Sequence, residues 1–202
     1  MILQALCEYY DRKKASSEED LAPHGWEWKE IPFLIVLSDQ GEFQAIEDTR
    51  EFEGKKFRAK RFLVPQGEKR TVGIKANYLW DNLEYALGAN PRGRDDIDLR
   101  HNEFKLRIEN ELGVGLLASN VSLRALKTFL DSDPIEQIES RTEFLPIWNE
   151  AMQANAFVAF KIGGSGDSTV CDSVRDLFPK RRHTEGGEDK EQVCLVTGEK
   201  TP

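Results

Sequence analysis

The sequence predicts an α+β fold in which a small antiparallel sheet packs with several helices. The segment "IPFLIVL" (31–37) is apolar throughout, as expected of a buried strand, and polar and apolar residues alternate in segments near it. Apolar residues recur near helical spacing through the middle third of the chain. With 202 residues, of which 39% are hydrophobic, the chain can bury one sizeable core.

A short amphipathic helix is predicted at the N-terminus. Its apolar and aromatic side consists of Ile2, Leu3, Leu6 and Tyr9 or Tyr10. The segment has no basic leader, no sustained apolar run and no cleavage site, which argues against a signal peptide and a membrane span. Three cysteines far apart, Cys7, Cys171 and Cys194, suit a reducing compartment better than a disulfide framework. We therefore expect a cytoplasmic protein with no membrane partner.

Residues 25–65 form the predicted β-rich part. Two β-like segments, 27–37 and 42–49, are joined by a glycine-containing turn, which is a hairpin signal. The segment "KFRAKRFLVP" (56–65) alternates basic and apolar residues and predicts a third strand. Its inward residues are predicted to be Phe57, Ala59 and Phe62, and its outward residues Lys56, Arg58 and Lys60.

Residues 77–152 are predicted to be mainly helical. After the exposed loop "PQGEKRTVGIKAN" (65–77), Asn77 can cap a helix that Gly88 closes. The apolar stripe of this helix consists of Leu79, Trp80, Leu83 and Leu87. Further helices are predicted at 97–112, 121–133 and 134–152. The first of them has the apolar positions Leu99, Phe104, Ile108 and Leu112.

The C-terminal part combines a strand with less regular segments. Residues 155–164 have strand character, and residues 167–178 predict a helix that begins at Asp167 or Ser168. We expect residues 163–192 to act mainly as a flexible connector. The final "VCLVTGEKTP" predicts a short strand and a turn, an ending typical of a truncated chain. Residues 1–202 are therefore expected to be a single domain of a longer protein.

The charge of the chain is unevenly distributed. The formal net charge is −8, yet residues 50–75 carry nine cations and three anions, a local charge of +6. The local field decides where a polyanion docks. Lys55, Lys56, Arg58, Lys60 and Arg61 form a predicted stripe of charge that continues into a loop with Lys69, Arg70 and Lys75. This stripe can hold phosphates, although a solvated run of charge is the simpler interpretation.

The loop after the stripe has features of a surface that reads bases. Asn and Lys side chains can reach base edges, and helix N-terminal amides can bind phosphate. Asn77 and Asn82 flank the predicted helix start, near Lys75. The alternative for Asn77 is a plain helix cap, and Trp80 fits the core better than a stacking platform.

Signals for catalysis and cofactors are weak. His24, His101 and His183 stand in ordinary contexts, and no G-x-S-x-G motif is present. The most acidic cluster, with Asp95, Asp96, Asp98, His101 and Glu103, reads best as a helix start, although a metal nuclease using Asp96, Asp98 and His101 stays open. Cys194 belongs to half of a zinc knuckle, and "GGSGDS" lacks the lysine of a P-loop. We predict no enzyme, no metal and no cofactor.

Several stretches, spread in order over both ends of the chain, carry a family resemblance. They are "MILQAL", "FLIVLSDQGEFQAIEDTRE", "EGKK" with "LVP", "GIKANYLWDNLEYALG" and "CLVTGE". Together they resemble the N-terminal region of the large, Csd1-type subunit of the type I-C CRISPR surveillance complex, Cascade. The resemblance runs from residue 1 to about residue 90 and resumes at 192–198. In that family the chain continues further, which implies that this is an N-terminal fragment.

The resemblance implies a non-catalytic subunit that recognises the protospacer-adjacent motif in duplex DNA. It also implies help in opening the duplex for pairing with the guide RNA, while a separate helicase-nuclease cuts. The implied partners are double-stranded target DNA, guide RNA, the other Cascade subunits and that helicase-nuclease. Motif reading carries over to Lys75, Asn77 and Asn82, with Gly73 allowing close approach to a groove. The alternative is a scaffold that holds the 5′ handle of the guide RNA without reading DNA.

Overall fold

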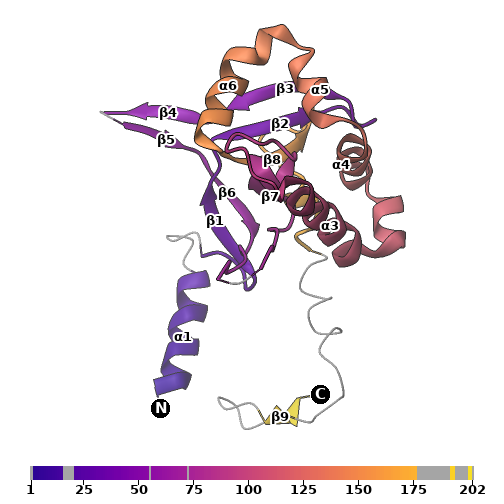
Figure 1. Cartoon of the computed structure of the whole chain (residues 1–202). Coiled ribbons are helices and arrows are strands. Elements are labelled where there is room, and N and C mark those ends of the chain that lie inside the picture. Colours follow the sequence, from indigo (N-terminus) through magenta and orange to yellow (C-terminus); the bar gives the residue numbers. More distant parts are fainter. Residues whose placement is uncertain are drawn as a thin grey trace. The chain divides into compact units, whose positions relative to one another are not determined.

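The computed structural model describes residues 2–15, 21–54, 56–71, 73–176, 192–193 and 200–201 (Figure 1). It has two units, residues 25–175 and residues 1–24 with 176–202. The second unit contains α1 (Ile2–Ala15), which confirms the predicted N-terminal helix, and the antiparallel pair β9 (Gln192–Val193) and β10 (Lys200–Thr201). Cys194, His183 and most of the predicted final strand lie outside the described residues. Within the described residues, no helix has the length and apolar character needed to cross a bilayer.

The larger unit mixes short strands with helices, which confirms the α+β class. Its strands are β1 (Trp26–Glu30), β2 (Phe33–Leu37), β3 (Phe43–Asp48), β4 (Arg50–Glu53), β5 (Lys56–Ala59), β6 (Arg61–Pro65), β7 (Trp80–Asn82) and β8 (Phe157–Ile162). Its helices are α2 (Leu83–Ala86), α3 (Ile97–Ser119), α4 (Val121–Asp131), α5 (Pro134–Glu139) and α6 (Leu145–Ala154), with 3₁₀ turns at Thr142–Phe144 and Asp172–Val174.

The central sheet has the strand order β3-β2-β8-β7 and is mixed (Figure 1). The β2–β3 hairpin and the β7–β8 pair are antiparallel, but β2 and β8 run parallel, with Ile35 opposite Phe160. The prediction of a wholly antiparallel sheet is therefore wrong at this pair. A parallel pair needs a long crossover, and here α2 to α6 lie between the two strands in the chain.

Three strand breaks meet at one junction, which we call the strand junction. The predicted strands 27–37 and 56–65 each break in two, at Ile31-Pro32 and at Lys60, and β3 and β4 part at Thr49. At the breaks, Ile31 N donates to Lys60 O (3.2 Å), Thr49 N to Pro32 O (3.0 Å) and Lys60 N to Thr49 O (3.1 Å). The strands therefore part into three pairs, β1–β6, β2–β3 and β4–β5.

Helices α3 and α4 cover the face of the sheet that carries Phe160. The Phe160 ring lies 6.2 Å from the ring of Phe104 on α3 and 6.3 Å from that of Phe129 on α4, and all three side chains are buried. Ile108 is also buried, as predicted. Leu99 is exposed, so its predicted place on the apolar stripe is wrong. The side chain of Leu112 lies outside the described residues.

The helix predicted after Asn77 is replaced by strand β7 and the single-turn helix α2. Leu79 has φ +66°, in the left-handed region that breaks a helix, and Trp80–Asn82 pair with β8. The cap of α2 is Asn82, whose Oδ1 accepts from Tyr85 N (3.3 Å), and not Asn77. The predicted stripe is nevertheless buried, and Trp80 belongs to the core as expected.

Residues 169–174 pack against the core although they fall within the predicted connector. Val170 N donates to Phe160 O (2.8 Å), and Val170, Cys171 and Val174 are buried. Of the helix predicted over 167–178, the described residues 167–176 form only the 3₁₀ turn Asp172–Val174. Residues 177–191 of the connector lie outside the described residues.

Candidate nucleic-acid interface

Strands β4 and β5 form a two-stranded antiparallel ribbon that projects from the central sheet (Figure 1). Its turn includes Gly54 with φ +69°. Phe52 and Phe57 are cross-strand partners whose rings make an edge-on contact with centroids 5.4 Å apart. Both are exposed, by 66% and 69%. The prediction that Phe57 faces inward is wrong, because the strand break at Lys60 directs β5 away from the core.

Arg50 fastens the base of the ribbon to helix α6. Its guanidinium donates to both carboxylate oxygens of Glu150 (2.6 and 2.9 Å) and to both of Asp48 (2.8 and 2.7 Å). It also lies over the ring of Phe33, 4.6 Å from the centroid. The hydrogen bonds from Arg50 lower the pKa of Asp48 and of Glu150 and raise the pKa of Arg50 itself. Bidentate pairs of this kind fix orientation as well as adding energy.

Replacing Arg50 by alanine should loosen the ribbon without unfolding the unit. We expect faster hydrogen exchange at the β4 and β5 amides, measured by mass spectrometry, and little change in β8. Because the two carboxyl pKa values are lowered, the native contact is complete above the ordinary carboxyl value of about 4 and is lost as pH falls through the lowered values. Wild type should thus approach the variant at acidic pH. Arg58→Ala on the same ribbon is the control, and equal exchange in Arg50→Ala and wild type at neutral pH would contradict the role of Arg50.

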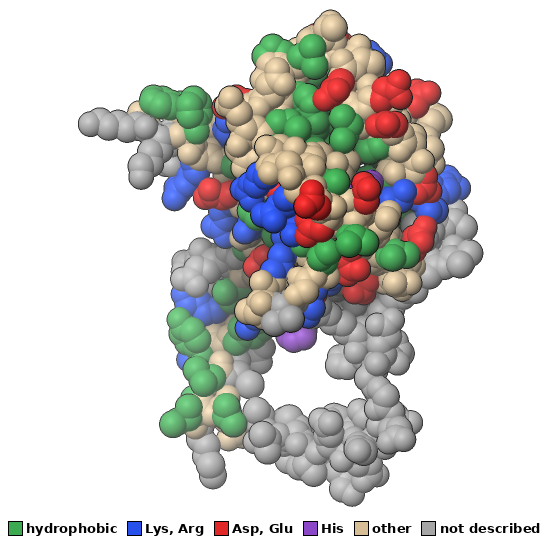
Figure 2. Space-filling model, in the orientation of Figure 1, with side chains coloured by type: hydrophobic (Ala, Val, Ile, Leu, Met, Phe, Trp, Pro, Cys, Tyr) green, Lys and Arg blue, Asp and Glu red, His purple; other side chains and the backbone are tan. Residues whose placement is uncertain are grey.

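The predicted charge stripe is exposed but partly paired. Arg58 Nε lies 3.6 Å from Glu30 Oε1, Lys60 Nζ lies 2.7 Å from Asp167 Oδ2, and the Arg61 guanidinium lies over the ring of Trp28. Such surface pairs contribute only about 0–1 kcal/mol and exchange readily for phosphate. Figure 2 shows Lys and Arg side chains gathered near the base of the ribbon and hydrophobic side chains on the ribbon itself. Lys55 and the side chain of Lys56 lie outside the described residues.

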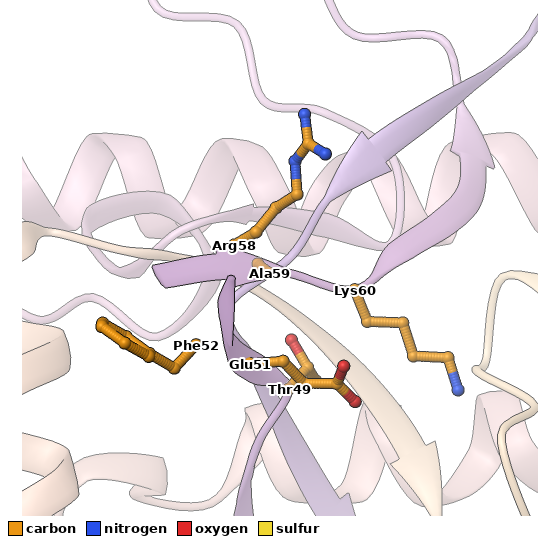
Figure 3. Close-up of a pocket in the computed structure, with 6 residues that line it drawn as sticks. All are labelled: Thr49, Glu51, Phe52, Arg58, Ala59 and Lys60. Carbon is orange, nitrogen blue, oxygen red and sulfur yellow. The ribbon is translucent and has the colours of Figure 1, made fainter. Parts of the chain in front are cut away.

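A pocket of about 430 Å³ lies at the base of the ribbon (Figure 3). It is lined by Thr49, Glu51, Phe52, Arg58, Ala59 and Lys60. Phe52 and Lys60 lie on opposite sides of it in Figure 3, and the guanidinium of Arg58 points away from the ammonium of Lys60. The pocket therefore combines one aromatic wall with two cations and one carboxylate.

Residues 66–79, which we call the basic loop, are anchored at both ends. Gly67 N donates to Glu27 Oε1 (3.2 Å) and Glu68 N to Asn77 Oδ1 (2.9 Å). Arg107 on α3 donates to Ala76 O and forms an ion pair with Glu68 (2.7 Å). These bonds hold the ends of the loop, so its exposed middle is presented from a fixed base.

A buried carboxylate, Asp81, organises the inside of the basic loop. It is 0% exposed and accepts hydrogen bonds from Arg70, from Asn77 N (2.7 Å) and from Asn82 N (2.7 Å). Burial raises the pKa of Asp81, and the three donors act in the opposite direction. Arg70 Nε also donates to Lys75 O (2.8 Å), and its guanidinium stacks 4.2 Å from the centroid of the Tyr85 ring. Arg70 thus joins two parts of the loop, through its bonds to Asp81 and Lys75 O. The sequence predicted a phosphate contact for Arg70 and did not indicate this structural role.

The structure separates the residues predicted to read bases. Gly73 and Lys75 are exposed, and Gly73 has φ +78° with open space where a Cβ would lie. Lys69 is exposed as well. Asn77 is buried, at 4% exposure, and Asn82 caps α2, so both amide side chains serve the fold in this conformation. Helix α2 is buried, which removes the predicted phosphate site at its N-terminus.

The comparison with protein families agrees with the resemblance seen in the sequence. A family model described as CRISPR-associated protein (Cas_Csd1) matches residues 6–202. The chain belongs to the Cas_Csd1 family. A search of curated proteins found no match.

This Csd1-family chain has a second cluster of arginines, which was not predicted from the sequence. The buried carboxylate of Glu84 lies 3.2 Å from Arg94 Nε, 3.8 Å from Arg92 Nε and 3.8 Å from Arg100 Nη1. Arg92 and Arg94 belong to the "NPRGR" turn. The two arginines on either side of Gly93 were the feature of the sequence from which this cluster could have been predicted. Because Glu84 is buried in α2, its partners could not be identified from local pattern.

The acidic segment near His101 is arranged as a helix start. Both carboxylate oxygens of Asp96 accept from Arg100 (2.9 and 2.8 Å), and His101 Nδ1 lies 3.0 Å from Tyr85 O. Burial lowers the pKa of His101. Among the residues that the structure describes, no three His, Cys, Asp or Glu side chains lie close enough to hold a metal ion.

Proposed function

We propose that this chain is a nucleic-acid-binding subunit of a type I-C CRISPR effector complex, with no catalytic role. It recognises the protospacer-adjacent motif in duplex DNA and aids strand opening for guide-RNA pairing. Its partners are target duplex, guide RNA, the other Cascade subunits and the helicase-nuclease that the complex recruits. The family supports a role in CRISPR systems. The observation that carries the rest is the basic loop, whose ends are anchored while Gly73 and Lys75 are exposed.

This arrangement suits recognition of base edges. The Arg70 bonds to Asp81 and Lys75 O order the loop before DNA arrives, which reduces the entropy lost on binding. Gly73 has no side chain to hold the backbone away from a groove, and Lys75 can donate to the O6 and N7 acceptors of guanine in the major groove. The exposed cations Arg58, Lys60 and Arg61 would contact the phosphate backbone of DNA or guide RNA without sequence preference.

Lys75→Ala tests motif reading. In the assembled complex, wild type is expected to enrich a short motif from duplexes randomised beside the target sequence. Lys75→Ala should reduce that preference by roughly tenfold, since one base contact contributes about 1–3 kcal/mol of discrimination. The matched control is Lys69→Ala, which should weaken binding to all duplexes alike.

Two outcomes would contradict the proposal. A uniform loss of affinity in Lys75→Ala would show that this lysine only positions the backbone. Binding of the guide-RNA handle by wild type without any duplex preference would favour the scaffold alternative.

A further inference from the structure

The ribbon β4–β5 exposes an aromatic pair that the motif-reading role of the basic loop does not use. Phe52 and Phe57 together place two phenyl rings at the surface, each about two-thirds exposed, at 66% and 69%. The two rings contact each other edge-on, and the Arg50 guanidinium lies 5.7 Å from the centroid of the Phe57 ring, so a further ring can stack on the faces that these contacts leave open. Large exposed apolar side chains gathered in one place mark a binding surface. The Arg50 bonds to α6 hold the base of the ribbon, so the pair is presented from a fixed support.

The charge around this pair favours a polyanion as its ligand. Residues 50–61 contain six Lys or Arg and two Glu, a local charge of +4 in a chain of −8. In the structure, Arg58 follows Phe57 in β5, so its side chain, which is 66% exposed, lies on the other face of the ribbon. Lys60 lines the same pocket as Phe52. Aromatic rings interleaved with cations are the pattern of single-strand nucleic-acid surfaces, in which bases stack on the rings and phosphates follow the charges.

We infer that the ribbon binds unpaired bases of a single strand, with a base stacked on the Phe52–Phe57 pair and a phosphate beside Lys60. This inference rests on the proposed function and assigns a second surface to it. A phenyl ring has no hydrogen-bonding group, so it cannot read base edges in a duplex. It can reach a base only where the face of that base is unstacked. Strand opening provides such bases.

The pocket at the base of the ribbon fits this ligand in size and polarity. Its volume of about 430 Å³ lies within the range of small-molecule sites. Phe52 supplies the apolar wall, and the hydroxyl of Thr49, which also lines the pocket, is already bonded to Ile31 O (2.5 Å). Glu51 is the cross-strand partner of Arg58 and offsets part of its charge, so phosphate is directed toward Lys60. The Lys60 to Asp167 ion pair, which is exposed, opens when phosphate binds.

Photo-crosslinking with the 202-residue chain tests this assignment. The probe is a single-stranded oligo-dT that carries one 5-iodouracil, which crosslinks to a stacked aromatic ring on irradiation. Mass spectrometry should locate the crosslink at Phe52 or Phe57. The variant Phe52→Leu/Phe57→Leu keeps the apolar surface and removes the ring faces. It should lose the crosslink and bind the oligonucleotide about tenfold more weakly, as expected when one base stack is lost.

A matched control replaces exposed leucines elsewhere. Leu99→Ala/Leu106→Ala on α3 removes two exposed apolar side chains away from the ribbon and should leave oligo-dT affinity within about twofold of wild type. The inference would be overturned if the phenylalanine variant bound oligo-dT with unchanged affinity and still crosslinked outside the ribbon. The aromatic pair would then be assigned to protein docking. Wild-type affinity for oligo-dT too weak to measure would overturn it equally.

The two proposals fail separately. If the phenylalanine variant binds oligo-dT normally while the assembled complex still selects a duplex motif through Lys75, only the ribbon inference fails. If the crosslink lies at Phe52 or Phe57 while no duplex motif is selected, the ribbon binds single strands and the motif-reading proposal fails.

Discussion

Replacing Arg70 by methionine should lower the free energy of unfolding by about 3–5 kcal/mol, the cost of leaving a buried charge without its partner. Asp81 is 0% exposed, and Arg70 is its only side-chain hydrogen-bond donor among the described contacts. Two backbone amides remain, and they cannot neutralise the carboxylate. Methionine retains much of the side-chain volume beside Tyr85, and the change removes the charge together with the hydrogen bond to Lys75 O. Chemical denaturation at neutral pH measures it.

The rescue and the control for Arg70 both lie within the same segment. In Arg70→Met/Asp81→Asn the buried carboxylate is gone, and we expect part of the lost stability to return, since a neutral amide costs less to bury. Lys69→Met changes the neighbouring, exposed cation and should alter the unfolding free energy by less than about 0.5 kcal/mol. Equal effects of Lys69→Met and Arg70→Met would show that Arg70 is not the organising cation of the loop.

Removing the charge stripe should have the largest effect on binding. For Lys55→Ala/Lys56→Ala/Arg58→Ala/Lys60→Ala we expect duplex affinity to fall and its dependence on salt to flatten. Each lost phosphate contact reduces the slope of log affinity against log salt by about 0.9. Titrations of a labelled duplex at several salt concentrations give that slope directly.

The control for the stripe is a variant of the same net charge. Lys105→Ala/Arg124→Ala/Lys127→Ala/Arg141→Ala removes four cations from the helical side of the unit. It should leave the salt slope near that of wild type, although it breaks ion pairs with Glu109 and Asp131. Identical slopes in the stripe variant and wild type would remove the stripe from the interface.

Local sequence patterns were sufficient to predict the helices and strands whose packing partners lie nearby in the chain. The hairpin β2–β3 and helices α3 to α6 follow from alternation, helical spacing and turn residues, since each of those signals lies within the element itself. The segment after Asn77 shows the limit. Its apolar spacing fits a helix, yet pairing with β8, some 75 residues later in the chain, selects a strand at Trp80–Asn82.

The sequence predicted which region of the chain forms the candidate site. It did not predict the role of each residue within that region. The positive charge of residues 50–75 is evident from composition. That Arg70 points inward while Lys75 stays exposed depends on Asp81, whose burial no local pattern indicates. Asn77 is a similar case, because its hydrogen bond from Glu68 N forms only when the loop closes. In the same way, exposure of Phe57 follows from the break at Lys60, which is set by a hydrogen bond to Thr49.

The strand junction has a mechanical consequence. The segments 26–37, 43–53 and 56–65 are each paired with both of the others, on either side of Ile31, Thr49 and Lys60. Strand β5 of the ribbon is joined to β6 through Lys60, and β6 ends at Pro65, whose carbonyl accepts from Trp80 Nε1 (2.8 Å). A single strand held at Phe52 and Phe57 would therefore pull on a ribbon that shares its junction with the strand leading into the loop that carries Lys75.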